Sequence, residues 1–297
     1  MKLLIAVFSP ATGTWGGLTR VVAVARAAEA AGHQVAFCAS GSLETSLRRH
    51  GYTVYSMPAA TFLGLPASLS RIVEQRSRRA TLPVRPGRDF GTTWLVLLIS
   101  GMAKAGYLKR LVAAELAAAR DFGAEFVFTD LDLGAFLTAQ IAGLPIAATY
   151  QSPMAQGVGT LPWKLLNRAI GSVQKTYRLP SQTVDVVCHG PGVLKIIPSI
   201  PELEATDPER PDVCYVGQLL GDIQPGEFQP EPGRRYVFVY MGTGSLSLDT
   251  LQRILPHVFD VDRKYICLVG AQSIQREERT GAVVSALRAS RRGPALL

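Results

Sequence analysis

Residues 126–147 read FVFTDLDLGAFLTAQIAGLPIA, and this stretch decides the fold. The apolar run over Glu125–Thr129 predicts a buried strand, and Pro145–Tyr150 predicts a second one. Between them, Leu133–Ala142 has the length and apolar character of a helix, and a Gly-Leu-Pro turn ends it. A strand, a helix and a second strand at this spacing indicate a unit in which the two strands run parallel.

The same alternation of strands and helices occupies the chain before this stretch. The predicted strands are Leu3–Phe8, Gln34–Ala39 and Thr53–Met57, and the predicted helical segments are Leu18–Ala31, Leu43–His50 and Trp94–Arg120. This order predicts an α/β fold, with a parallel sheet and helices on both of its faces. The connection over residues 58–91 is too long for an ordinary loop, so we expect it to be functional or mobile.

A proline-rich stretch, Pro198–Pro211, separates this region from the rest of the chain. We therefore predict a first domain over residues 1–211 and a second over residues 212–297. The second domain is predicted to contain the strands Tyr236–Tyr240 and Tyr265–Val269, with the helix Leu248–Phe259 between them. A complete α/β domain needs about 150 residues, so we expect the second domain to be incomplete.

Composition excludes several classes of protein. The 297 residues are 47% hydrophobic and 18% charged, which excludes a disordered chain. The apolar run over residues 94–99 is shorter than the roughly 20 residues of a membrane-spanning helix, and Leu3–Phe8 is too short for a signal peptide. We therefore predict a cytoplasmic protein. The four cysteines are widely scattered, so we expect buried thiols and neither a zinc site nor a disulfide framework.

The net charge of +8 is unevenly distributed along the chain. Residues 71–88 contain six arginines and one glutamate, which gives this segment a net charge of +5. Two interpretations stay open: a solvated basic loop, or an electropositive rim for an anionic acceptor or an acidic membrane surface. No aromatic residues stand between these arginines and no DNA-reading motif occurs, so nucleic acid is not an expected partner.

Three loops follow predicted strands at the edge where open parallel sheets bind ligands. Residues 12–17, TGTWGG, allow a close approach of the backbone to a ligand or form a tight turn before a packed helix. Asp130 and Asp132 can orient a general base, bind a hydroxyl group or cap the next helix, and capping is the commonest of these roles. Residues 242–245, GTGS, offer amides and hydroxyls to a diphosphate or form a simple turn. The second strand lacks an acidic residue for a ribose, which argues against a nicotinamide cofactor.

Three stretches together resemble one family of enzymes. The first is LTRVVAVARAAEAAGHQVAF at Leu18–Phe37, a helix with a Gly-His turn into the next strand. The second is residues 126–147, and the third is Val213–Gly217 followed by YVFVYMGTGS from residue 236. In this order they resemble the bacterial natural-product and macrolide glycosyltransferases of the GT-B type, which consist of two facing Rossmann-like domains. The resemblance extends over residues 1–270.

The resemblance implies inverting transfer of a hexose from a nucleoside-diphosphate sugar, such as a UDP-sugar, to a hydroxyl of a small lipophilic acceptor. The first domain holds the acceptor and the second the donor, and no metal or further cofactor is implied. In the family a histidine in the first loop is the general base, and an aspartate after the fourth strand orients it. Here the histidine position falls at Gly17, whereas Asp130 matches the aspartate. Asp130 is therefore the predicted catalytic residue, either as the base itself or with Thr14 or Arg20 positioning the acceptor.

The resemblance also implies two sets of binding residues. The predicted acceptor-binding residues are Thr14, Gly16, Gly17, Arg20, Asp132 and Gln151. The predicted donor-binding residues are Gly242, Thr243, Gly244, Ser245 and Gln272. A contact of residues 71–88 with an acidic membrane surface and a homodimer are the further partner predictions.

The donor side departs from the family. Its His-Gly-Gly loop does not occur after residue 270, so we expect a truncated donor domain and a chain that is inactive in this form. The alternative is a non-catalytic acceptor-binding or helper protein derived from such a transferase. A sugar epimerase on the same fold is a third hypothesis, which needs acidic residues at nucleotide-facing positions.

Overall fold

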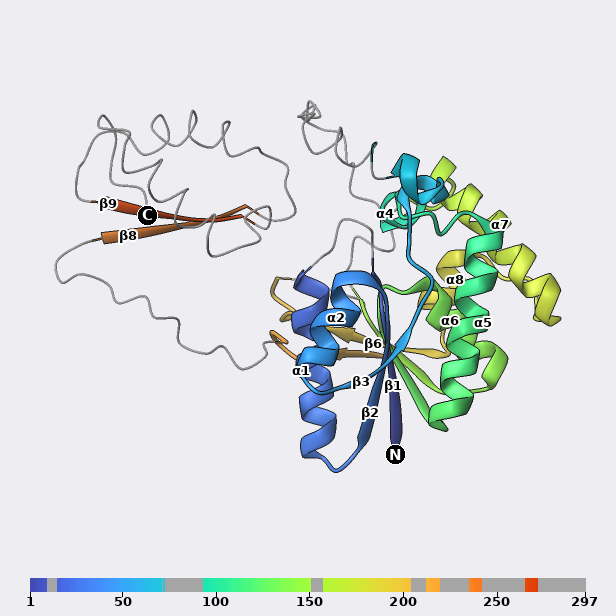
Figure 1. The fold of residues 1–297 in the computed structure, drawn as a ribbon, viewed down its shortest axis with the longest axis horizontal. Coiled ribbons are helices and arrows are strands. Elements are labelled where there is room, and N and C mark those ends of the chain that lie inside the picture. The colour runs from blue at the N-terminus through green and yellow to red at the C-terminus, as the bar shows by residue number, and fades with distance from the viewer. Residues whose placement is uncertain are drawn as a thin grey trace. The chain divides into compact units, whose positions relative to one another are not determined.

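The computed structural model describes residues 1–9, 15–70, 72, 93–150, 157–203, 212–219, 235–241 and 265–271. The chain divides into two compact units. Unit 1 consists of Met1–Val73 and Gly87–Ile223, and unit 2 of Glu74–Pro86 and Gln224–Leu297. Each unit is described by itself (Figure 1).

Unit 1 is built on a sheet of seven strands that are all parallel to their neighbours. Their order across the sheet is β3-β2-β1-β4-β5-β6-β7. The strands are β1 (Lys2–Val7), β2 (Gln34–Ala39), β3 (Thr53–Ser56), β4 (Phe126–Asp130), β5 (Ile146–Thr149), β6 (Val193–Ile197) and β7 (Val213–Tyr215). The predicted α/β class and parallel sheet are confirmed.

Helices cover both faces of this sheet, with α1 and α2 on one face and α5, α6 and α8 on the other (Figure 1). The helices are α1 (Trp15–Ala30), α2 (Gly41–Arg49), the 3-10 turn η1 (Phe62–Gly64), α4 (Thr93–Ile99), α5 (Ala105–Phe122), α6 (Leu133–Ala142), α7 (Leu161–Tyr177) and α8 (Val184–His189). In the described part of the chain, none of these helices combines the length and the apolar character needed to cross a membrane.

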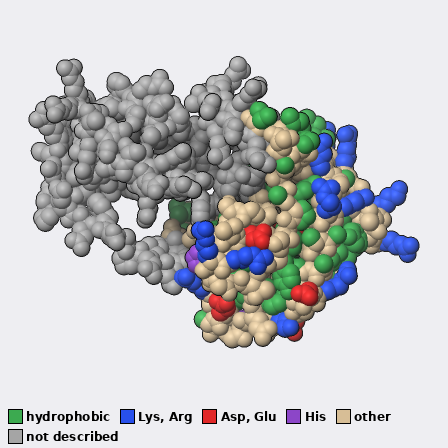
Figure 2. All heavy atoms as spheres, viewed as in Figure 1, with side chains coloured by type: hydrophobic (Ala, Val, Ile, Leu, Met, Phe, Trp, Pro, Cys, Tyr) green, Lys and Arg blue, Asp and Glu red, His purple; other side chains and the backbone are tan. Residues whose placement is uncertain are grey.

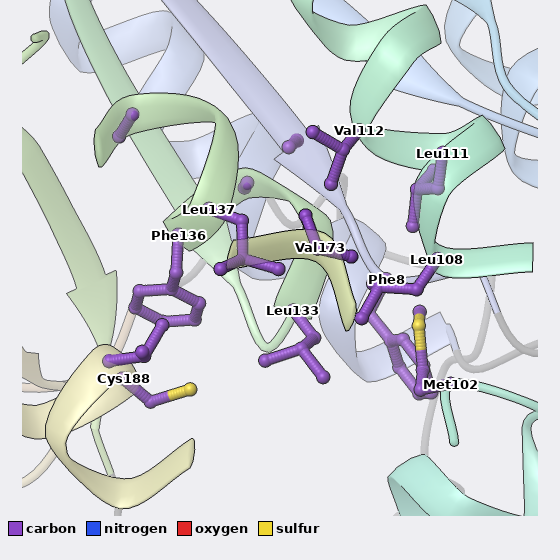
Figure 3. Packing of buried hydrophobic residues seen from close by; sticks show 14 of the residues in the cluster. Phe8, Met102, Leu108, Leu111, Val112, Leu133, Phe136, Leu137, Val173 and Cys188 are labelled. Carbon is purple, nitrogen blue, oxygen red and sulfur yellow. The ribbon is translucent and has the colours of Figure 1, made fainter. Parts of the chain in front are cut away.

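The alternation of side chains along β1 explains the two core layers. Leu4 packs into the layer under α5 and α6, whereas Ile5 packs into the layer under α1 and α2. A central strand that is buried on both faces needs apolar residues at every position. On the larger layer, Leu111 of α5 and Leu137 of α6 belong to one cluster of buried side chains (Figure 3).

The last strand of this sheet, β7, lies after residue 211, where the first domain was predicted to end. Val213–Tyr215 pairs in parallel with β6, so it is the edge strand of unit 1, which continues to Ile223 rather than ending at residue 211. The side chain of Lys195 in β6 is fully buried and forms an ion pair with Asp212, which anchors this edge.

Unit 2 is described only at two strands, β8 (Arg235–Met241) and β9 (Tyr265–Ala271), which pair in parallel. They confirm the predicted strands Tyr236–Tyr240 and Tyr265–Val269. The predicted helix Leu248–Phe259 lies outside the described residues.

The cysteines follow the prediction at two positions and depart from it at a third. Cys38 and Cys188 are buried, whereas Cys214 is exposed, because it lies on the edge strand β7. The expectation of a buried thiol is therefore wrong at Cys214. Among the described residues, no group of three His, Cys, Asp or Glu side chains is placed to hold a metal ion.

Candidate functional site

The carboxyl ends of β1, β4 and β5 lie next to one another at one edge of the sheet. Val7 is in register with Asp130, and Thr129 is in register with Ala148. Because side chains alternate along a strand, Asp130 lies on the same face as Phe128, which packs in the layer of α1 and α2. A polar side chain on α1 can therefore reach Asp130.

Arg20 of α1 forms a two-pronged ion pair with Asp130. The Arg20 Nε atom donates to Asp130 Oδ1 at 3.1 Å, and the Nη2 atom donates to Oδ2 at 2.9 Å. The hydroxyl of Thr149, at the end of β5, also donates to Oδ1. Bidentate contact between a guanidinium and a carboxylate is the strongest and most directional form of this pair. Asp130 is 5% exposed and the Arg20 side chain 29% exposed, so the pair meets solvent from the Arg20 side.

This geometry bears directly on the predicted catalytic residue. A general base must receive a proton on an oxygen that faces the substrate. Both oxygens of Asp130 already accept hydrogen bonds, from Arg20 and from Thr149. Oδ1 accepts two of these hydrogen bonds and Oδ2 one, so Oδ2 keeps one lone pair for a proton, and the role of Asp130 as base stays a prediction.

Gly17, the predicted counterpart of a catalytic histidine, lies one helical turn before Arg20. Gly16 and Gly17 are in the first turn of α1, which begins at Trp15. Residues three apart on a helix share a face, so Arg20 lies on the same side of α1 as Gly17. The guanidinium of Arg20 thus contacts Asp130 from the side of α1 on which Gly17 lies.

Asp132 lies on the opposite side of this strand end from Asp130. Leu131 between them has a φ of 70°, a left-handed conformation that leucine seldom adopts. Asp132 is the N-cap of α6, and its carboxylate accepts a hydrogen bond of 2.9 Å from the Gly134 amide. Burial raises the pKa of Asp132 to about 6, against the lowering effect of the amide hydrogen bonds. The capping role is confirmed, and acceptor binding by Asp132 stays a prediction.

A second buried carboxyl, Glu115 of α5, adjoins Asp132 and was not predicted. Its Oε2 atom accepts a hydrogen bond of 2.8 Å from Thr138, and its Oε1 atom has no partner among the described residues. Burial, and then the charge of Asp132, raise the pKa of Glu115 well above its ordinary value, which favours the protonated form of this carboxyl. The signal was a lone glutamate on the apolar face of the helix, between Leu111 and Leu116.

An aromatic cluster beside the carboxyl end of β5 was also missed. Tyr150 follows β5 directly, and its ring meets the ring of His189 edge-on, with centroids 5.1 Å apart. The His189 ring also contacts Trp94 of α4, at 5.7 Å between centroids. His189 ends α8 (Val184–His189), a helix that the sequence analysis did not predict.

The other predicted site residues are not brought together by the described structure. Thr14 and Gln151, on the acceptor side, lie outside the described residues. The same holds for every predicted donor-side residue: Gly242, Thr243, Gly244, Ser245 and Gln272. Two of the predicted residues, Arg20 and Asp130, are joined by hydrogen bonds in the described structure.

Comparison with known proteins adds the fold family. No family model and no curated protein sequence matches the chain. Among solved structures, the glycosyltransferase SnogD from Streptomyces nogalater matches 91% of this chain and 72% of its own, at 18% identity and a TM-score of 0.56. The fold is that of the GT-B glycosyltransferases.

Two further structures with the GT-B fold contain ligands. The glycosyltransferase VinC, in complex with dTDP, matches 95% of this chain and 69% of its own, at 16% identity and a TM-score of 0.55. The spinosyn rhamnosyltransferase SpnG, in complex with spinosyn aglycone, matches 91% of this chain and 65% of its own, at 15% identity and a TM-score of 0.51. The predicted resemblance to bacterial natural-product glycosyltransferases is confirmed at the level of the fold.

Proposed function

We propose that this chain is a glycosyltransferase that transfers a hexose from a nucleoside-diphosphate sugar to a hydroxyl of a small lipophilic acceptor, with inversion. The observation that carries the proposal is the buried Asp130 at the carboxyl end of β4, on the face of α1, in a GT-B fold. That VinC binds dTDP and SpnG binds an aglycone supports both substrate classes.

In this proposal the acceptor oxygen attacks the anomeric carbon while the bond from that carbon to the diphosphate oxygen breaks. The acceptor hydroxyl loses its proton to a base, and the diphosphate leaves with the bonding electrons. Asp130 takes that proton when the acceptor hydroxyl replaces one of the two hydrogen bonds from Arg20. Arg20 then keeps the carboxylate oriented through its second prong.

A second function is favoured by the same ion pair. Arg20 and Thr149 already occupy both oxygens of Asp130, and the histidine position holds Gly17. An enzyme that has lost its base can retain a hydroxyl-binding pocket. The second candidate is therefore a non-catalytic acceptor-binding or helper protein.

The test is a transfer assay with the purified full-length chain, UDP- and dTDP-hexoses and a panel of lipophilic alcohols and phenols. The glycosylated product is measured by mass spectrometry, and binding by the shift in melting temperature. For a transferase, Asp130→Asn is expected to lower the rate by about 100-fold or more, because a general base contributes about that much. The matched control is Asp121→Asn, at the exposed end of α5.

The outcomes separate the two candidates. Product formation that depends on Asp130 supports the transferase. A melting shift with an acceptor, without product from any donor, supports the binding protein. If the chain shows neither a shift in melting temperature nor product, both proposals are overturned.

The remaining predictions belong to the same proposal. The donor diphosphate is assigned to residues 242–245 and Gln272, and the acceptor to the region of Gly16, Gly17 and Gln151. Location in the cytoplasm, a homodimer and the contact of residues 71–88 with an acidic membrane surface remain predictions.

A further inference from the structure

The helix α4 exposes apolar side chains where a surface helix ordinarily carries polar ones. Its sequence, TWLVLLI, contains one polar residue. Trp94 and Leu97 are buried, whereas Val96 is 39% and Ile99 37% exposed. A helix that is apolar on all sides is ordinarily covered by protein or lipid. The exposed face of α4 therefore needs an explanation.

The segment around η1 exposes further apolar side chains next to α4. Leu63 is 38%, Leu69 50% and Ile72 47% exposed. The segment folds back on itself, because the Phe62 amide donates to Ser70 Oγ at 2.8 Å. We call Leu63, Leu69, Ile72, Val96 and Ile99 the apolar lobe.

The turn after α4 joins the two parts of the apolar lobe. Gly101 has a φ of 82°, and a Cβ atom at this position would lie 2.8 Å from the Thr61 carbonyl oxygen and 2.9 Å from the Gly64 nitrogen. Only glycine permits so close a contact between the α4–α5 turn and η1. Figure 2 shows hydrophobic side chains gathered at this end of the described part of unit 1.

Three described segments that form or adjoin the apolar lobe carry cations and no acidic residue, and the stretch that contains Ile72, residues 71–88, has six arginines and one glutamate. Residues 57–70, 93–114 and 157–177 contain no Asp or Glu. The helix α7 packs against α4, and the Lys104 side chain packs against Gly64. The basic residues of these segments are Lys104, Lys109, Arg110, Lys164, Arg168 and Lys175. Exposed apolar side chains in a region where cations outnumber acidic residues match a surface that is anionic outside and apolar within.

We propose that the apolar lobe docks this protein on the surface of a bilayer that contains anionic phospholipid. Its five side chains enter the boundary between headgroups and acyl chains, and the bordering lysines and arginines face the lipid phosphates. A symmetric contact between two copies is disfavoured, because it brings the same cations together across the interface. The inference goes beyond glycosyl transfer and holds for a transferase or a binding protein alike.

The experiment is sedimentation of the full-length chain with vesicles of phosphatidylcholine alone and of phosphatidylcholine with about 30% phosphatidylglycerol, at about 0.15 M salt. The chain is expected to bind the anionic vesicles at least about tenfold more strongly than the neutral ones. Val96→Ser with Ile99→Ser is expected to weaken binding about tenfold, because less apolar surface enters the bilayer. Lys104→Ser is expected to weaken it about fivefold, as for one charge near an anionic surface.

The matched control is Leu194→Ser with Leu203→Ser, at side chains that are 42% and 81% exposed and lie outside the apolar lobe. This control is expected to bind vesicles like the unchanged chain. Circular dichroism confirms that each variant is folded. Absence of binding to anionic vesicles, or equal loss in the control, overturns the proposal. It is also overturned if Val96→Ser with Ile99→Ser abolishes a dimer seen by light scattering while vesicles are not bound.

Discussion

The two faces of the β4 strand end hold their carboxyl groups in opposite ways. On the α1 face, Asp130 lies in an ion pair with Arg20 and accepts a further hydrogen bond from Thr149. On the α6 face, Asp132 and Glu115 are buried side by side, and the pKa of each is raised by that burial. On the α1 face a cation balances the carboxylate, whereas on the α6 face burial favours the protonated form of each carboxyl.

The contrast shows which face can serve chemistry. A paired carboxylate exchanges one hydrogen-bond donor for another when a ligand arrives, whereas the Asp132 carboxylate is committed to the first turn of α6. The left-handed residue Leu131 turns the chain so that these two acids, two positions apart, lie on different faces. Backbone strain of this kind is kept where the surrounding structure requires it.

The largest expected effect comes from breaking the ion pair. Arg20→Leu leaves Asp130 buried without its cation and is expected to lower the free energy of unfolding by about 3 kcal/mol. Adding Asp130→Asn to Arg20→Leu is expected to restore more than half of that loss, because no lone charge remains buried. Urea denaturation at pH 7 measures the free energy of unfolding of the single and the double variant. A double variant less stable than Arg20→Leu alone would show that the pair is not what stabilises this face.

The second-largest expected effect is a dependence of stability on pH that arises from Asp132, on the α6 face. The pKa of Asp132 is raised from 3.8 in the unfolded chain to about 6 in the folded one, so the folded state binds more protons between these values. The stabilisation of the folded state by the proton on Asp132 is fully present below pH 4 and is lost as the pH rises through 6. The loss amounts to about 3 kcal/mol, at 1.36 kcal/mol for each pKa unit.

The measurement is the difference in unfolding free energy between Asp132→Asn and the unchanged chain, from urea denaturation at pH values between 4 and 8. Asparagine also caps helices and does not titrate, so the variant is expected to gain relative stability as the pH rises. Equal pH profiles for the two chains would refute the assignment. Asp121→Asn, at an exposed position, is the control and is expected to show no such gain.

Local pattern was enough to predict most of the first 150 residues, but not the contacts of the site. Strands such as Gln34–Ala39 and helices such as Leu133–Ala142 have the predicted bounds, because their apolar periodicity is strong. The short strand β7 was not assigned to the sheet of the first domain, because a three-residue strand has little pattern of its own and pairs with β6 only in the folded chain. No local pattern links Arg20 to Asp130, which are 110 residues apart and meet only through the register of the sheet.

The smallest expected effect compares two threonines that serve the two faces. Thr149 donates to Asp130, whereas Thr138 donates to the protonated Glu115 at 2.8 Å. Hydrogen bonds to charged groups contribute about 1.5–3 kcal/mol and neutral ones about 0.5–1.5 kcal/mol. Thr149→Val is therefore expected to destabilise the chain by about 2 kcal/mol at pH 7, and Thr138→Val by about 1 kcal/mol.

Valine matches threonine in shape, so the two variants differ chiefly in the carboxyl that loses its donor. Urea denaturation at pH 7 gives both losses on one scale, and the ranking is the result that matters. If Thr138→Val is the more destabilising, Glu115 carries a charge in the folded protein, and the contrast between a paired and a protonated face fails. If Thr149→Val is the more destabilising, Asp130 carries the charge that Glu115 lacks, and the contrast between the paired carboxylate and the protonated carboxyl holds.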